Sequence, residues 1–227
     1  PSVQEVALGA VREMAAYDAT NQEAIVAQGG VQVVLRALET HRGLASIQVL
    51  GLGVLRNLTV GKAPQPEVQD AVISRGGVEA VLDAMAAHAE DADVQKAGCW
   101  ALFCVSVGNA EIQEALGAFG VPEVVLKVME EHQGDARVQE AACWVLKTLS
   151  KYVATSSPRR TFVTSTQAVL KAMERCAASA PAQTAAAGAL KSLASHDDSG
   201  WVQSACLGRA GRFGRSTTKH ALAVIKE

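Results

Sequence analysis

The feature that most constrains the fold of this chain is a helix-like pattern that returns five times along the sequence. Its clearest copies are VQKAGCWALFCV at residues 94–105 and VQEAACWVLKTL at residues 138–149. A glutamine fixes the register of each copy, and the spacings between successive glutamines are 44, 47, 44 and 44 residues. These glutamines are Gln4, Gln48, Gln95, Gln139 and Gln183. Self-similarity at a period of this length is typical of proteins built from stacked structural repeats.

A second marker runs at the same period. It is a Val-Leu or Ala-Val-Leu stretch whose leucines are Leu35, Leu82, Leu126 and Leu170, at spacings of 47, 44 and 44 residues. Apolar residues recur in both stretches at the i, i+3, i+4, i+7 positions of an amphipathic helix. A glycine precedes the second stretch at Gly29-Gly30 and Gly76-Gly77, and more loosely at Gly120. We therefore expect three helices in each repeat: a short helix, a glycine break, and two amphipathic helices.

The repeat at residues 109–152 shows how the local signals place these helices. Asn109 is expected to cap the short first helix. Pro122 is expected to begin the second helix, since proline suits the first helical turn. The third helix is expected to run from Arg137 to about Lys151.

The other copies follow the same frame with local differences. Asn21 is expected to open an earlier short helix. The stretch at 155–160 (TSSPRR) is expected to be a loop, in a repeat that lacks the double glycine. The whole chain is then a single repeat domain, with partial repeats at 1–18 and 197–227, the latter a partial repeat or a C-terminal cap. The full repeats are 19–62, 63–108, 109–152 and 153–196.

The pattern resembles the armadillo repeat, through GGV before the second helix, the VL pair within it, and VQxxxxWxL in the third. This resemblance implies an all-α, right-handed superhelical solenoid of three-helix armadillo repeats. The alternative is an array of HEAT-like repeats, which are two-helix units. In an armadillo array the third helices line a concave groove that binds protein partners. The resemblance therefore implies a non-enzymatic protein-interaction scaffold.

One branch of that family, the importin α proteins, grips basic cargo with a WxxxN pair in the third helix. Trp100 and Trp144 match the tryptophan, but Cys104 and Thr148 stand at the asparagine position. Asn57 matches the asparagine without the tryptophan. Because no repeat holds the full pair, we do not expect import-adaptor function by that mechanism.

The position three residues after the tryptophan is mostly basic. Down the array it is occupied by Arg12, Arg56, Phe103, Lys147 and Lys191. Neighbouring side chains of such a row would lie roughly 8–10 Å apart, the distance between packed helices. The row would favour an extended acidic or phosphorylated segment as its ligand. Trp100, Phe103 and Trp144 would supply aromatic anchors, and Asn57 lies on the same surface. The alternatives are that the cations form an ordinary solvated edge and that the tryptophans pack between repeats.

The remaining polar residues do not indicate catalysis. His41, His88 and His132 each follow a second helix, where a histidine interacts well with the helix C-terminus. The five cysteines form no CxxC pair, and we expect buried reduced thiols. No HExxH, GxSxG or DxDxDG motif occurs. We therefore expect no enzyme, no cofactor, no metal site and no small-molecule substrate.

The charge balance and hydropathy leave two classes of function open. The formal net charge is −2, which does not indicate nucleic acid as the partner, and no apolar run is long enough for a membrane span. The basic tail residues around Phe213 would suit a nucleic-acid or acidic-lipid patch, and the alternative is an exposed last helix or loop. These residues are Arg209, Arg212, Arg215 and Lys219. We expect a cytoplasmic scaffold that binds protein or peptide, with nuclear or cytoskeletal association as alternatives. The other class is a structural module of a large cytoskeletal or ciliary assembly.

Overall fold

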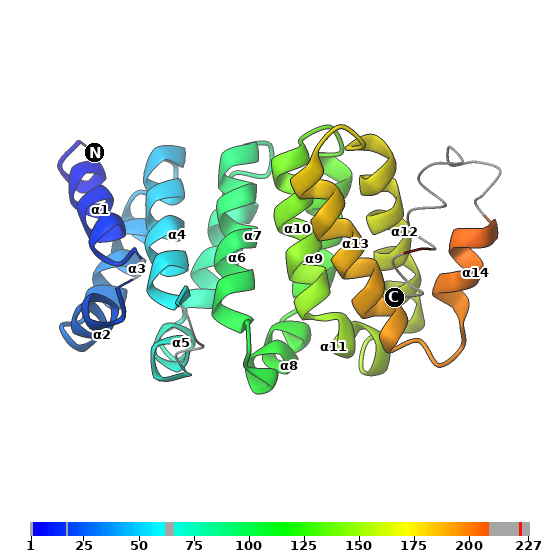
Figure 1. Ribbon diagram of the computed structural model, residues 1–227. Coiled ribbons are helices and arrows are strands. Elements are labelled where there is room, and N and C mark those ends of the chain that lie inside the picture. The colour runs from blue at the N-terminus through cyan, green and yellow to red at the C-terminus, as the bar shows by residue number, and fades with distance from the viewer. Residues whose placement is uncertain (1, 17, 62–65, 209–222, 224–227) are drawn as a thin grey trace. The chain divides into compact units, whose positions relative to one another are not determined.

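The computed structural model describes residues 2–16, 18–61, 66–208 and 223, and all the regular structure in these residues is helical (Figure 1). The chain divides into two compact units, Pro1–Ile112 (unit 1) and Gln113–Glu227 (unit 2). The predicted all-α class is confirmed for these residues, while the solenoid type stays a prediction. The basic tail from Arg209 to Lys219 lies outside the described residues.

Unit 1 contains seven helices in its described part, and α8 spans the boundary between the units. The unit 1 helices are α1 (Ser2–Met14), α2 (Ala19–Ala27), α3 (Gly30–Thr40), α4 (Ala45–Thr59), α5 (Pro66–Ile73), α6 (Gly77–Ala87) and α7 (Ala92–Ser106). The next helices are α8 (Ala110–Ala118), α9 (Val121–Glu131), α10 (Ala136–Thr148), α11 (Ser150–Thr155), α12 (Arg159–Arg175), α13 (Ala180–Ser195) and α14 (Trp201–Gly208).

Helices that share a place in the repeat pack against one another within each unit. In unit 1, α4 packs against α1 on one side and α7 on the other, and α3 packs against α6. In unit 2, α10 packs against α13 and α9 packs against α12. The third helices supply the largest share of the core, with Ile47, Leu52, Leu102, Leu146 and Leu190 fully buried. Each such side chain contributes about 1.5–3 kcal/mol through its removal from water.

The glutamine that marks each repeat joins the second helix to the third. In four copies its Nε2 donates to the backbone carbonyls ten and seven residues earlier, at 2.6–3.1 Å. These carbonyls lie at the C-terminal end of the preceding helix, where no intrahelical donor remains. We call this pair of bonds the glutamine cap, and its members are Gln48, Gln95, Gln139 and Gln183. The recurrence of glutamine in the sequence is explained by this buried capping role.

The double glycine serves two different needs. Gly29 has a φ of 79°, in the left-handed region that glycine adopts without strain. Gly30 has an ordinary φ, but a Cβ there would lie 2.7 Å from the Ile25 carbonyl oxygen. Val121 stands at the second position in the looser copy, where Gly120 alone takes the positive φ. The first glycine therefore permits the turn, and the second permits close approach of α2 to α3.

Two of the predicted helix starts can be compared with the observed caps. Asn109 accepts from the Ile112 amide at 3.2 Å, as predicted. The prediction for Asn21 is wrong, because the N-cap of α2 is Asp18, whose carboxylate accepts from the Asn21 amide at 2.9 Å. Asp18 has the extended backbone that an N-cap requires. The Asn21 side chain instead donates to the carbonyl of Met14 at 3.0 Å.

The junction between the repeats 109–152 and 153–196 differs most from its predicted course. The third helix of the first of these repeats was expected to reach about Lys151, but α10 ends at Thr148 and α11 follows after Leu149. The expected loop at 155–160 is also shorter than predicted, since α12 begins at Arg159. Because the second of these repeats lacks the double glycine, α12 runs without a break for 17 residues.

Candidate protein-binding surface

The basic and aromatic candidates in unit 1 form one connected cluster on α1, α4 and α7. We call it the unit 1 cluster, and it consists of Arg12, Gly53, Arg56, Asn57, Trp100 and Phe103. The Arg56 guanidinium carbon lies 5.3 Å from the centroid of the Trp100 ring. The Trp100 and Phe103 rings meet edge to face, with centroids 5.7 Å apart. These cation–π and aromatic contacts hold the two rings and the guanidinium in one arrangement.

Arg12 takes the corresponding place one third helix earlier, where a glycine stands instead of the tryptophan. Its Cδ lies 3.0 Å from the position that a Cβ on Gly53 would occupy. Gly53 stands in the same slot of α4 that Trp100 holds in α7. The basic side chain of one third helix therefore lies over the tryptophan slot of the next helix. Arg12 also pairs with the exposed carboxylate of Glu13 at 2.8 Å, a pair that contributes little in water.

Asn57 is used inside the protein. Its Nδ2 donates to the Arg12 carbonyl oxygen at 2.9 Å, which ties α4 to the C-terminal turn of α1. The side chain is half-buried. The Asn57 side chain therefore fixes the register between α1 and α4. Its main contribution to the cluster is to position the backbone of Arg12.

Arg56 is the most constrained cation of the cluster. Its side chain is half-buried, and its Nε atom is buried without a hydrogen-bond partner. No described carboxylate forms an ion pair with it. Burial raises the pKa of the neighbouring Cys104 thiol, while the charge of Arg56 and its hydrogen bond to the thiol oppose that rise. The guanidinium thus lies beside a ring and a thiol, and no acid in the described part of the chain forms an ion pair with it.

The candidates in unit 2 lie on α10 and α13, and we call Trp144, Lys147, Gly188 and Lys191 the unit 2 cluster. Lys147 Nζ lies 4.3 Å from the centroid of the Trp144 ring on the same helix. The Lys147 stem also crosses to α13, where its Cδ lies 3.4 Å from the Cβ position of Gly188. Lys191 is exposed. The structure therefore brings Trp144 and Lys147 together and leaves Lys191 in solvent.

A second set of buried glutamines was missed by the sequence analysis. Gln22 Nε2 donates to the Asn57 and Val60 carbonyls at 2.7 and 2.8 Å. Gln69 Nε2 donates to the Val107 carbonyl at 2.9 Å. Both glutamines belong to first helices and cap the end of a third helix, directly below the cluster residues. Their 47-residue spacing matches the other markers and could have revealed them.

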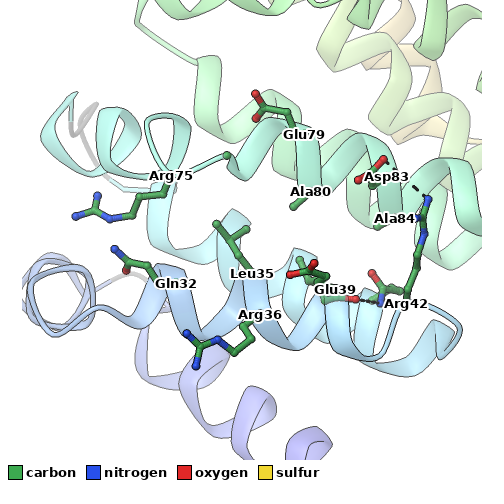
Figure 2. Close-up of a pocket in the computed structure, with 13 residues that line it drawn as sticks. Gln32, Leu35, Arg36, Glu39, Arg42, Arg75, Glu79, Ala80, Asp83 and Ala84 are labelled. Carbon is green, nitrogen blue, oxygen red and sulfur yellow. Dashed lines mark hydrogen bonds and ion pairs between the residues drawn. The ribbon is translucent and has the colours of Figure 1, made fainter.

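Unit 1 also contains a cleft between the second helices α3 and α6 that the sequence analysis did not predict (Figure 2). Its volume is about 490 Å³, and side chains of both positive and negative charge line it. Three cations and three anions line it, and these are Arg36, Glu39 and Arg42 from the α3 side, Arg75 before α6, and Glu79 and Asp83 from α6. Arg42 and Asp83 approach each other to 4.0 Å and are both exposed. Because cations and anions are balanced, the cleft favours no class of charged ligand.

The equivalent cleft of unit 2 lies between α9 and α12 and is smaller, at about 130 Å³. It is lined by Glu130, Lys171 and Arg175, so its charges are again mixed. Each unit thus has a cleft between second helices that is lined by both cations and anions. The clusters on the third helices are the better candidates, since their cations lie beside aromatic rings.

The histidines and cysteines lie where the sequence placed them. His41, His88 and His132 take the C-cap positions of α3, α6 and α9 through their backbone amides. The His88 imidazole lies 2.8 Å from the Arg42 carbonyl oxygen after α3, and not at the end of its own helix. All five cysteines are buried thiols, and burial raises the pKa of Cys99 to about 12. Within the described part of the chain, no group of three or more His, Cys, Asp or Glu side chains is placed to hold a metal ion.

Comparison with known proteins gives no relative for this chain. No protein-family model matches it, and no curated protein matches it. Among the helices of the described residues, none has both the length and the apolar character that crossing a membrane requires.

Proposed function

We propose that this chain is an armadillo-like helical repeat protein that acts as a non-enzymatic scaffold for protein–protein interaction. Its binding surface consists of the third helices, and its ligand is an extended acidic or phosphorylated segment of a protein partner. The observation that carries the proposal is the arrangement of Arg56 and Lys147. Each cation is held against a tryptophan ring, and neither forms an ion pair with a described carboxylate.

Physical chemistry supports an anionic ligand at these positions. A guanidinium fixed in place binds a carboxylate or phosphate through charge-assisted hydrogen bonds, with little further loss of side-chain freedom. The rings beside it supply apolar contact area, and tryptophan and arginine are enriched where binding energy is concentrated. Within each unit such positions lie on third helices that pack against one another, which suits an extended segment more than a compact ligand.

The glutamine caps support the repeat interpretation. Four copies make the same pair of bonds at the same sequence separations. Three short helices, α2, α5 and α8, each precede a glycine with a positive φ. A short first helix that ends at a glycine favours the armadillo unit over the two-helix HEAT unit.

The test is affinity capture from native lysate with three forms of the chain. The binding variant carries Trp100→Ala and Trp144→Ala, and the control variant carries Arg36→Ala and Glu79→Ala in the α3/α6 cleft. Circular dichroism checks that all three are equally helical. We expect a defined set of acidic proteins to be lost with the tryptophan variant and kept with the control. Capture that is unchanged by both variants, or reduced equally by both, contradicts binding at the third helices and favours a structural module with dispersed contacts.

A further inference from the structure

A short non-helical link joins α11 to α12 in unit 2 and carries two serines, Ser156 and Ser157. Ser157 is followed by proline, and Ser157-Pro158 is the only Ser-Pro or Thr-Pro pair in the sequence. Arg159 and Arg160 come directly after this pair, so the stretch is Ser-Pro-Arg-Arg. The proposed binding at the third helices does not use any of these residues.

The backbone of this link suits an enzyme that binds its substrate in extended form. Pro158 is exposed and extended, with a φ of −54° and a ψ of 139°. It takes the N-cap position of α12 but makes no side-chain capping bond, whereas the Ser179 hydroxyl caps α13. Because an uncapped helix start leaves amides unsatisfied, the first turn of α12 opens more easily than that of α13. The stretch from Ser157 to Arg160 can therefore extend with little loss of structure.

The side chains of this stretch are accessible or held by single bonds. Ser157 is half-buried, and its Oγ donates to the Val153 carbonyl at 2.6 Å. Arg159 and Arg160 are exposed, and no described carboxylate forms an ion pair with either of them. An acidic enzyme surface can thus bind both arginines without breaking an ion pair among the described residues.

A Ser-Pro-Arg-Arg stretch has the chemistry that one class of protein kinase selects. Proline has no N–H group, so it is favoured by an enzyme cleft that would leave the N–H after the acceptor serine unpaired. Acidic side chains farther along such a cleft favour arginine two or three positions after the serine. We propose that Ser157 is a phosphorylation site for a proline-directed protein kinase. Ser157 Oγ attacks the γ-phosphorus of ATP, the bond from that phosphorus to ADP breaks, and the hydroxyl proton passes to a carboxylate of the kinase.

The phosphate acts on the contact between α12 and α14. Ser157 lines a hollow of about 240 Å³ together with Arg159, Asp197, Asp198 and Ser199. Arg159 Nη2 donates to Ser199 Oγ at 3.4 Å, which joins the start of α12 to the loop before α14. A phosphate on Ser157 competes for Arg159 through a charge-assisted bond and repels Asp197 and Asp198. Phosphorylation therefore loosens α14 from α12.

The site is tested by incubating the full chain with ATP and a cyclin-dependent kinase, which is proline-directed, and by locating the phosphate with mass spectrometry. The variants are Ser157→Ala, Pro158→Ala and the matched control Ser156→Ala, each checked for helicity by circular dichroism. We expect phosphate on Ser157 in the wild type and in Ser156→Ala, and none in the link of Ser157→Ala. The rate should fall by at least about tenfold in Pro158→Ala. No phosphate on Ser157, or an equal rate for the wild type and Pro158→Ala, overturns the proposal.

Hydrogen exchange of the α14 amides tests the effect of the phosphate. We expect these amides to exchange faster by at least about threefold in the phosphorylated chain, while the α10 amides are unchanged. Arg159→Ala without phosphate should also speed exchange in α14, because it removes the bond to Ser199. Exchange in α14 that phosphorylation of Ser157 leaves unchanged, or speeds no more than in α10, contradicts the release of α14.

Discussion

The unit 1 and unit 2 clusters place the same types of residue in the same slots but connect them differently. In unit 1, Arg56 of α4 reaches forward to the ring of Trp100 on α7, at 5.3 Å. In unit 2, Lys147 of α10 lies over the ring of Trp144 on its own helix, at 4.3 Å. The cation therefore meets a ring of the next third helix in unit 1, whereas in unit 2 it meets a ring of its own helix and lies beside Gly188 of the next.

The difference follows from the residue in the tryptophan slot of the next helix. That residue is Trp100 for Arg56 and Gly188 for Lys147. A glycine offers no ring, so Lys147 lies over Gly188 with its stem and ammonium, and the ring that its ammonium meets is Trp144 of its own helix. Arginine also stacks on a ring with its planar guanidinium, which lysine lacks. The residue in this slot thus decides whether a surface cation meets an aromatic ring of the neighbouring repeat.

The first prediction tests whether this difference is confined to the surface. Gln95→Leu and Gln139→Leu each remove one glutamine cap, beneath the unit 1 and unit 2 clusters respectively. Each leaves two carbonyls unpaired, so we expect each to cost about 2 kcal/mol of unfolding free energy. Denaturant unfolding measures both. A loss for one variant more than twice that for the other would mean that the two units differ in their interior as well.

The second prediction concerns the strength of the two cation–π contacts. A double-mutant cycle with Arg56→Ala and Trp100→Ala should give a coupling energy of about 1 kcal/mol, because this contact is half-buried. The cycle with Lys147→Ala and Trp144→Ala should give about 0.5 kcal/mol, as an i, i+3 pair on one helix. Urea unfolding supplies the free energies. Equal couplings, or a larger one in unit 2, would contradict the comparison.

The third prediction converts the unit 2 cluster to the unit 1 arrangement. Gly188→Trp combined with Lys147→Arg supplies the missing ring and the planar cation. A Cβ at Gly188 would make only ordinary contacts, all of them with the flexible side chain of Lys147. We expect a favourable coupling of about 0.5–1 kcal/mol between the two substitutions. Gly188→Trp alone is the control, and no coupling would show that residue type in this slot does not direct the cation.

The fourth prediction uses Cys104 as a reporter of the Arg56 charge. Burial raises the pKa of this thiol, and Arg56 opposes that rise. Arg56→Met keeps the side chain in place without the charge, so the pKa of Cys104 should rise further. Less thiolate is then present at a given pH, and alkylation of Cys104 should be slower from pH 7 to 9. Alkylation of Cys206, where burial alone raises the pKa to about 11, is the control. Faster or unchanged alkylation of Cys104 would contradict the placement of Arg56.

Much of the helical framework could be predicted from the sequence, because the residues that recur at each period cap or pack the helices. The glutamines at 48, 95, 139 and 183 recur since each caps a helix, and the apolar stripe of α10 is buried as expected. The cap of α2 was not predictable in the same way. Asp18 and Asn21 are both good capping residues, and only the backbone conformation decides between them.

The candidate surface was less predictable than the framework. Spacing placed Arg56, Lys147 and the tryptophans on third helices, but it could not show which ring each cation meets. That choice depends on the register between packed helices and on whether the next slot holds Trp100 or Gly188. The use of Asn57 as an internal donor to Arg12 also depends on this register. The preference of the surface for an acidic segment stays a prediction.

The most direct test of that preference is selection of random peptides on the immobilised chain. The account predicts that the selected peptides are extended, rich in Asp, Glu or phosphorylated residues, and sensitive to salt. Their affinity should fall by at least about tenfold, or 1.4 kcal/mol, when Arg56→Ala and Lys147→Ala are combined. The control carries Arg36→Ala and Arg75→Ala in the α3/α6 cleft and should bind as the wild type does. Selected peptides without acidic residues, or peptides that bind the Arg56→Ala/Lys147→Ala variant as tightly as the wild type, would contradict the account.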